Sequence, residues 1–414
     1  MTGRSIRFGP ELRRRRMAAG LSLIKFAARV NYTKGYLSKI ETGEKPPTLD
    51  LARRCDAELD AGGTLVALVT PARPRPAGRS GPVQPLPALS EPPLSGPPTG
   101  WPAHDPEWAA GLREAAVPES ALTIFGAMFE QHRLLGHQAS PNVVLPGLAA
   151  QASTLQALAG QTDDAELAGR LLRLTARYAE YAGWMAQEAG DDRAAMEWTG
   201  AAVTLATASG DADLARYALV RAADIALYRD DAVQTIELAR RAQADPDTAV
   251  GIRALAAQRE AQGHAMAGAE AACRSALERA AGLLPAGPPG TRPAFGSTSL
   301  ADPIAITTGW ALHDLGRSKE AAEILDREVP RIPATAARSR ARYGIRQALA
   351  HAVAGNLEIA CALTATLLPD AVRADSATIR VDLRRLARSL VRWRSDPAVR
   401  ELYPRLTAAL HTGR

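Results

Sequence analysis

Apolar residues in the first 70 positions recur with helical spacing, in short runs separated by turn residues. A first helix is predicted from about Pro10 to Ala19, because proline suits a first helical turn and Gly20 ends the run. Ser22 is the expected N-cap of a second helix. The apolar face of that helix consists of Leu23, Phe26, Ala27 and Val30.

Three more helices complete this N-terminal segment. The third is expected to begin after the N-cap Thr33 and to stop at Gly43. Asn31 lies in the turn before it, and asparagine tolerates the left-handed conformation. A fourth helix is expected from Thr48 and a fifth over Thr64–Val69. The second helix, the short turn and the third helix form the arrangement that places one helix in a DNA major groove.

From about residue 105 to 414 the helical spacing continues without strand-like alternation, and the chain repeats itself. Five expected turns are spaced by 40, 38, 48 and 39 residues: Gly190, Asp230, Gly268, Gly316 and Gly355. The positions seven before and five after each turn are small in every copy, which lets paired helices approach closely. The copy at Gly309–Pro333 resembles the tetratricopeptide repeat, and this resemblance implies a helical solenoid.

The two helical regions are separated by residues 71–104, which contain 11 prolines and 4 glycines. Such a composition is typical of a semi-extended spacer rather than of a packed element. The sequence therefore predicts an all-α protein with a helix-turn-helix domain at 1–70, a flexible linker at 71–104 and a repeat domain at 105–414.

Charge separates the same regions. Residues 1–70 hold 13 Lys and Arg against 7 Asp and Glu, a net charge of +6, whereas the remaining residues hold 37 of each. Four of the five lysines lie in the first 45 residues. Arginine-rich coding bias accounts for the high isoelectric point but not for this segregation. A basic head on a neutral body is expected for a protein that binds nucleic acid.

Several classes of protein are disfavoured. No apolar run approaches the length of a membrane span, and the N-terminus lacks the apolar core of a signal peptide, so a cytoplasmic protein is expected. The three cysteines lie far apart and form no metal-binding pattern with histidine, so neither a metal nor a cofactor is expected. GxSxG, HExxH and strand-linked GxGxxG motifs are missing, and no enzymatic activity is predicted.

The run GLSLIKFAARVNYTKGYLSKIETGEKPPTLDLARR resembles the phage-repressor-like (XRE) helix-turn-helix family, with a match over about residues 9–69. Its specific features are Ala27, the turn at Asn31 and the stretch from Tyr36 to Glu41 followed by Gly43. The resemblance implies that Arg16 and Glu41 are paired charges that link the first helix to the third. Leu23 stands where the family often has a phosphate-contacting glutamine, so that contact is expected to be lost.

The resemblance and the groove geometry select the same DNA-contacting residues. Lys34 and Gly35 begin the recognition helix, and Ser38 and Lys39 lie one turn further on the same face, toward base edges. Phosphate contacts are expected from Thr33, Tyr36 and Lys45. The alternative is that Tyr36 packs against the second helix and that Lys45 is simply solvated.

The first helices of tetratricopeptide-like repeats line a concave surface. Counting back three, six, ten and thirteen positions from the turns predicts the residues of this lining. They include Arg177, Glu180, Trp184, Gln187, Tyr217, Asp224, Gln258, Gln262, Trp310, His313 and Arg342. Amides, aromatic rings and both charge signs suit a groove for an extended peptide. An ordinary solvated surface is the equally open alternative.

The whole layout resembles the peptide-sensing regulators of the quorum-response type, although their connector is usually a helix rather than a proline-rich linker. The resemblance implies a transcriptional regulator that binds double-stranded DNA, forms a homodimer and senses a signal peptide or small molecule. The alternative is an interaction scaffold whose head is a DNA tether or is vestigial. The C-terminal helices, about Asp382 to Leu410, are expected either to pair two copies or to cap the solenoid.

Overall fold

The computed structural model describes residues 5–69, 118–284 and 299–411, and within these ranges it contains helices and no strand. The all-α prediction is confirmed. The expected linker at 71–104 lies outside the described residues. Five helices form the N-terminal head: α1 (Ser5–Ala18), α2 (Leu23–Arg29), α3 (Lys34–Glu41), α4 (Leu49–Glu58) and α5 (Thr64–Val69).

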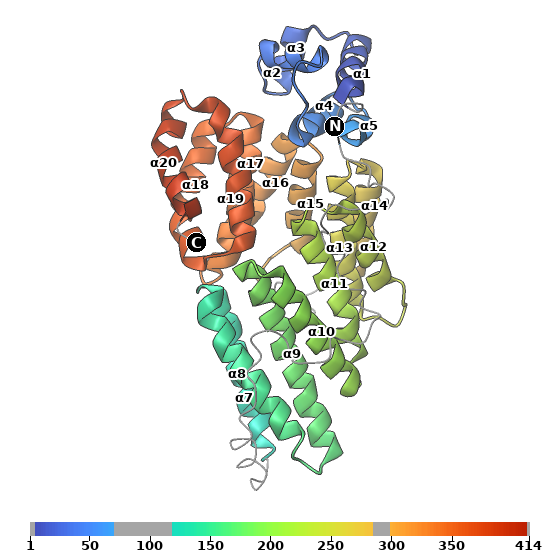
Figure 1. Ribbon diagram of the computed structural model, residues 1–414, viewed down its shortest axis with the longest axis vertical. Helices are drawn as coiled ribbons and strands as arrows, with labels where there is room; N and C mark the ends of the chain where they lie inside the picture. Colours follow the sequence, from blue (N-terminus) through green and yellow to red (C-terminus); the bar gives the residue numbers. More distant parts are fainter. Residues whose placement is uncertain (1–4, 70–117, 285–298, 412–414) are drawn as a thin grey trace, which may run out of the picture.

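The body consists of successive helices joined mostly by short turns (Figure 1). They are α7 (Ser120–Gly136), α8 (Pro141–Ala159), α9 (Ala165–Ala189), α10 (Asp192–Ala208), α11 (Ala212–Tyr228), α12 (Ala232–Gln243), α13 (Val250–Met266), α14 (Glu270–Leu283), α15 (Pro303–Asp314), α16 (Ser318–Glu328), α17 (Ala337–Ala354), α18 (Leu357–Ala374), α19 (Ala377–Leu390) and α20 (Pro397–His411). The short 3₁₀ turns η2 (Val329–Arg331) and η3 (Val391–Trp393) follow α16 and α19.

Local signals in the head set its helix boundaries. The side chains of Ser22, Thr33 and Thr48 each accept a hydrogen bond from a backbone N–H in the first turn of the helix that follows. The first helix begins earlier than predicted, at Ser5, and Pro10 lies inside it. Phe8 lies four residues before the buried Leu12 on the same helical face and is itself fully buried. Its burial in the head core stabilises an additional helical turn before Pro10.

A buried carboxylate holds the last two head helices together. Asp56, only 6% exposed, accepts hydrogen bonds of 2.7 Å from the backbone N–H groups of both Gly63 and Val66. The acceptor therefore satisfies amides that the short α5 leaves free at its N-terminus. Apolar side chains from all five helices fill the core beside it: Phe8, Leu12, Phe26, Leu37, Ile40, Leu51 and Leu65.

The body is an array of helix hairpins whose turns coincide with the five predicted positions. Gly190, Asp230, Gly268, Gly316 and Gly355 all have positive φ, between 56° and 94°. All ten positions of the two small-residue columns are buried. At Gly183 an added Cβ would lie 3.2 Å from the Ala195 carbonyl oxygen across the hairpin. The small residues therefore allow the close helix approach that the repeat pattern predicted.

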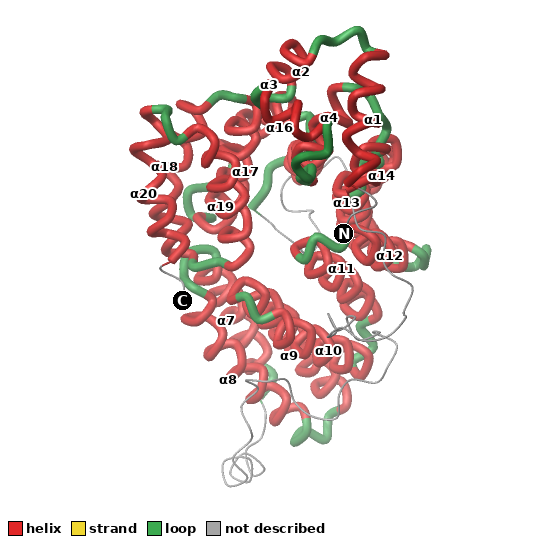
Figure 2. Tube along the Cα trace, turned by 45° about the horizontal axis from the view of Figure 1, so that its top comes forward, coloured by secondary structure: helices red, strands yellow, loops and turns green. Residues whose placement is uncertain are grey.

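The hairpins stack through their first helices and the array closes on itself. Helices α9, α11, α13, α15, α17 and α19 contact one another in that order, and α19 also contacts α9 (Figure 2). Glu188 at the end of α9 accepts hydrogen bonds of 2.9 Å from Arg338 and from Thr378, and Ser376 also donates to it. Because Glu188 and Arg338 are almost completely buried, this contact is a structural joint between α9 and the helices α17 and α19.

The C-terminal helices use their apolar stripes within the chain. Leu386, Leu390, Leu402 and Leu406 are buried in the core formed by α17–α20, and Trp393, Tyr403 and Leu410 pack partly buried against it. The capping alternative thus accounts for the apolar stripe from Asp382 to Leu410. Pairing of two copies through the same leucines would require this core to open.

Candidate nucleic-acid interface

The recognition helix α3 is positioned by its two ends and by its buried face. Thr33 Oγ1 accepts a 3.2 Å hydrogen bond from the Tyr36 N–H at the start, and Gly43, with φ +79°, ends the helix turn. Leu37 and Ile40 are buried against the other head helices. The opposite face of α3 is therefore presented to solvent at a fixed orientation.

The predicted base-reading residues lie on that exposed face. Lys34, Gly35 and Lys39 are exposed and Ser38 is half-buried. A Cβ added to Gly35 would meet no atom within 4 Å, so packing within the head does not require glycine at this position. The exposed side chains are consequently free to enter a groove, and Gly35 leaves room for close approach to DNA.

The predicted phosphate contacts form a second, adjoining group. Tyr36 stacks on Tyr32 with ring centroids 5.2 Å apart, and Lys45 Nζ lies 5.3 Å from the Tyr36 ring. Thr33 and Lys45 are exposed. Partial burial, strengthened by the nearby Asp50 charge, raises the pKa of Tyr36, so its hydroxyl is a neutral hydrogen-bond donor. One side of the Tyr36 ring therefore packs on Tyr32, in the turn after α2, as the alternative interpretation expected.

Arg16 and Glu41 lie side by side, as the family resemblance implied. Arg16 Nε and Nη2 donate to the two Glu41 carboxylate oxygens at 2.6 and 2.9 Å, and Arg16 Nη1 donates to the Leu21 carbonyl at 2.7 Å. The bidentate geometry fastens α1 to the end of α3. Gly9 makes the contact possible, because a Cβ there would lie 2.4 Å from the Ile40 carbonyl oxygen.

This geometry agrees with the comparison to known families. Residues 7–69 match the family model of the helix-turn-helix domain. The chain therefore carries a DNA-binding head of this type. The match ends with α5 and does not extend into the helical body. No curated protein and no solved structure matches the chain significantly.

The helix-turn-helix head does not stand apart from the body but is seated on it (Figure 1). Asn31 Nδ2 donates to the Val353 carbonyl at 2.9 Å, and Arg53 Nη2 donates to the Met266 carbonyl at 3.2 Å. Arg53 Nη1 also lies 3.8 Å from an Asp314 carboxylate oxygen. The contacts come from the end of α2 and from α4, so the recognition helix remains uncovered.

Backbone packing at the body's turns completes the seat. An added Cβ at Gly316 would lie 2.6 Å from the Arg53 carbonyl oxygen, and one at Gly268 would lie 3.3 Å from Gly63 Cα. Arg392, from η3, places its guanidinium 4.8 Å from the centre of the Tyr32 ring. Sequence reasoning missed these docking residues, because nothing local distinguishes a turn residue or a helical arginine that faces another domain.

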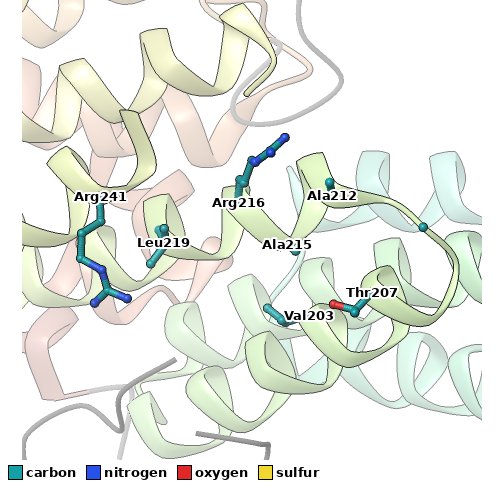
Figure 3. Close-up of a pocket in the computed structure, with 8 residues that line it drawn as sticks. Val203, Thr207, Ala212, Ala215, Arg216, Leu219 and Arg241 are labelled. Atoms are coloured by element: carbon teal, nitrogen blue, oxygen red, sulfur yellow. The ribbon is translucent and has the colours of Figure 1, made fainter. Parts of the chain in front are cut away.

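A polar cleft of about 850 Å³ opens between head and body. Its wall carries both charge signs, and most of these charges are paired. Arg29 pairs with Glu58, and Arg317 pairs with both Glu270 and Glu320. A smaller hollow of about 520 Å³ lies between α10, α11 and α12 (Figure 3). Small and apolar residues and two arginines, Arg216 and Arg241, line it.

The predicted concave groove is corrected in part. Gln187, Gln258 and Gln262 are buried, and each is hydrogen-bonded within the body rather than facing an open surface. Neighbouring first helices pack directly on one another. This packing buries part of the helix face that was predicted by counting back from each turn. A peptide therefore does not find these three amides free.

The charged groove residues form an internally paired chain. Arg221 contacts Glu180 at 3.5 Å, Asp224 at 3.0 Å and Gln187 at 2.8 Å. Arg259 continues the chain from Asp224 to Gln262. Burial, opposed by nearby guanidinium groups, raises the pKa of Glu180. These residues stabilise the stack of α9, α11 and α13, and the Nε atoms of Arg221 and Arg259 lie in ion-pair contact with Glu180 and Asp224.

Four further predicted groove residues also contact other residues of the body. Arg177 is 5.3 Å from the Phe129 ring, and Trp184 packs on Tyr181. Trp310 donates a 3.0 Å hydrogen bond to Asp314. His313 Nδ1 lies 3.2 Å from the Ser318 hydroxyl, and burial lowers the pKa of His313 to about 4. The Trp310 ring also lies 5.5 Å from the guanidinium of Arg342, another predicted groove residue, so the structure brings part of the predicted set together.

No group of three or more His, Cys, Asp or Glu side chains is placed to hold a metal ion in residues 5–69, 118–284 and 299–411. None of the helices in the same ranges has both the length and the apolar character of a membrane span.

Proposed function

We propose that this protein is a sequence-specific transcriptional regulator whose helical body controls the DNA-binding head. One observation carries the proposal: Lys34 and Lys39 are exposed on α3 while α4, on another face of the head, is seated on the body. A head held in this way presents its recognition helix to DNA and keeps a direct connection to the domain behind it. The proposal places the protein in the cytoplasm and assigns it no enzymatic activity.

The body is proposed to be a tetratricopeptide-like solenoid that pairs two copies. A single helix-turn-helix head reads one half-site, so a second head supports specific binding. Five exposed large apolar side chains gather on α7 and the first turn of α8: Ile124, Met128, Leu134, Leu135 and Val143. Pairing through this surface does not disturb the buried C-terminal core, unlike pairing through α19 and α20.

Light scattering of the full chain tests the pairing. We expect a dimer at micromolar concentration and a monomer for the double variant Met128→Glu/Leu135→Glu, because a buried charge opposes apolar association. Val372→Glu is the matched control, since this residue is also exposed and apolar but lies on α18. A wild-type monomer, or a dimer that the double variant leaves intact, contradicts this surface.

Selection of bound sites from random DNA by the full chain tests the regulator proposal. A regulator enriches a defined sequence, whereas a scaffold with a tethering head shows only salt-dependent binding to any sequence. On the enriched site, Lys39→Ala is expected to cost ~1–3 kcal/mol, about 5–150-fold in affinity, and to relax the preference at one base pair. Lys25→Ala is the control, because Lys25 is an exposed lysine of the same head outside the recognition helix.

Equal losses on the enriched site and on random DNA for Lys39→Ala would refute its base-reading role. Failure to enrich any sequence refutes the regulator proposal itself and favours the scaffold.

A further inference from the structure

One region of the body holds several polar atoms whose partners are missing. Arg342 of α17 lies among three aromatic rings, with its guanidinium carbon 5.1 Å from Tyr228, 5.5 Å from Trp310 and 5.7 Å from Tyr343. No carboxylate oxygen of the described residues lies within 4 Å of its nitrogens, although nearly every other guanidinium around it is ion-paired.

Three atoms beside these rings that can donate a hydrogen bond lack an acceptor. Arg342 Nε, Arg346 Nη1 and the Tyr228 hydroxyl are each buried and have no hydrogen-bond partner. Arg346, one helical turn after Arg342, is 3% exposed and lies against the Trp310 ring. Its other two nitrogens donate to Asp382 at 2.9 Å, so only Nη1 is left over. All three atoms are able to donate, and a buried donor without an acceptor is costly.

The nearest acidic groups are already engaged. Glu188 accepts from Arg338, Ser376 and Thr378, and Asp382 accepts from Arg346 and Arg385. Asp314 accepts from Trp310, and Asp224 accepts from Arg221 and is ion-paired with Arg259. An acceptor for the three free donors must therefore come from outside these residues, and Arg342 as a whole is only half-buried.

From this arrangement we infer a binding site for an organic carboxylate at Arg342, Arg346 and Tyr228. A carboxylate offers up to four acceptor positions and matches the planar guanidinium fork. The rings of Tyr228 and Trp310, set edge to face at 5.9 Å, and the apolar Leu227 and Met266 beside them suit an aromatic or aliphatic group attached to it. The inference rests on the proposed control of the head by the body and names a class of ligand for it.

The position of the site suits a sensor. Trp310 forms part of the site and also donates to Asp314, whose other carboxylate oxygen lies 3.8 Å from Arg53 of the head. An occupant that contacts the Trp310 ring therefore acts on a residue that helps to hold the head in its seat.

Calorimetric titration of the full chain tests the site with four probes. Benzoate and the tripeptide Ala-Ala-Phe with a free C-terminus carry the carboxylate; benzamide and the amidated tripeptide are their neutral counterparts. We expect one equivalent of at least one acid to bind, with the amides at least 10-fold weaker. Benzoate binding alone indicates a small free acid as the natural ligand, and peptide-acid binding alone indicates a peptide C-terminus.

Substitutions at the site test whether the acids bind there. Arg342→Met is expected to weaken acid binding by about 10–150-fold, because a hydrogen-bonded charge contributes ~1.5–3 kcal/mol. Tyr228→Phe, which removes only the hydroxyl, is expected to weaken it by about 2–10-fold. Arg340→Met is the matched control on the same helix, since Arg340 is also half-buried but is placed beside none of these rings.

The inference is overturned if neither acid binds at 10 mM, if amides bind as well as acids, or if Arg342→Met and Arg340→Met behave alike. The same preparations are tested for selection of a defined DNA sequence. Specific DNA binding without carboxylate binding removes this site and leaves the regulator proposal standing. Carboxylate binding without specific DNA binding removes the regulator proposal and leaves the site.

Discussion

The seat of the head on the body can be broken by adding one methyl group at Gly316. This glycine ends the turn between α15 and α16 with φ +91°, and an added Cβ would lie 2.6 Å from the Arg53 carbonyl oxygen. Gly316→Ala therefore imposes both left-handed backbone strain and a clash with the head. Gly210→Ala is the matched control, because Gly210 has φ +71° in a turn whose Cβ position is open.

The size of the effect follows from the contacts that must yield. An ordinary contact begins at 3.4 Å, so the Arg53 backbone must retreat by about 0.8 Å. That shift lengthens the hydrogen bonds from Arg53 to Met266 and from Asn31 to Val353, each worth ~0.5–1.5 kcal/mol. The docked state should lose ~1–3 kcal/mol, or about 5–150-fold in population. Backbone strain of ~1–2 kcal/mol is common to both variants and cancels in the comparison.

Single-molecule energy transfer measures the docked population directly. Dyes on Met17→Cys in the head and Ile359→Cys in the body label exposed positions, and the native Cys55, Cys273 and Cys361 are all buried. We expect a second, low-transfer population with Gly316→Ala and none with Gly210→Ala. Identical transfer distributions for the two variants would show that the contact at Gly316 does not hold the head.

Three further outcomes are expected. Glu41→Ala leaves Arg16 unpaired, so hydrogen exchange in α3 should accelerate by an amount equivalent to ~3–5 kcal/mol. Glu58→Ala breaks an exposed pair and should change the exchange by less than ~1 kcal/mol. Equal effects contradict a stabilising role of the Arg16–Glu41 pair. Lys45→Ala should weaken binding to all DNA sequences alike and lower the salt slope by about one, and a sequence-dependent loss would count against a phosphate contact. Burial holds the pKa of His313 at about 4, below its unfolded value of ~6.5, so the unfolded chain takes up the proton first as pH falls. The free energy of unfolding should therefore decline by ~3 kcal/mol in all between pH 6.5 and 4. Urea titrations should show a shallower decline for His313→Gln.

The local architecture was predictable because its determinants are local. Caps such as Ser22 and Thr33 act on backbone groups two or three residues away, and a left-handed turn requires glycine, asparagine or aspartate wherever it occurs. The early start of α1 was missed because the decisive contact, the burial of Phe8, involves the head core rather than the neighbouring residues.

The candidate sites also differ in whether their determinants are local or distant in the sequence. Lys34 and Lys39 could be placed from the face of a single helix, and the Arg16–Glu41 pair from a family resemblance. The docking contact of Asn31 with Val353 joins residues 322 positions apart, and the loose donors at Arg342 and Tyr228 come from different hairpins. The spacing rule selected Arg342 and Trp310 as separate lining residues but did not show that both meet Tyr228, because such contacts depend on how the whole array curves and closes.

The five repeat turns contact two different parts of the molecule. Gly268, Gly316 and Gly355 lie against the head, where the missing Cβ both permits the left-handed turn and admits the head's surface at contact distance. The first two turns serve the closure instead: an added Cβ at Gly190 would lie 3.2 Å from Ala377, and Asp230 accepts a 2.6 Å hydrogen bond from Arg385 of α19. One series of turns therefore meets the closing helix at one end and the DNA-binding head at the other. On the proposed function, a change in curvature that opens the contact with α19 is expected to change the spacing of the turns beneath the head and so to move the recognition helix.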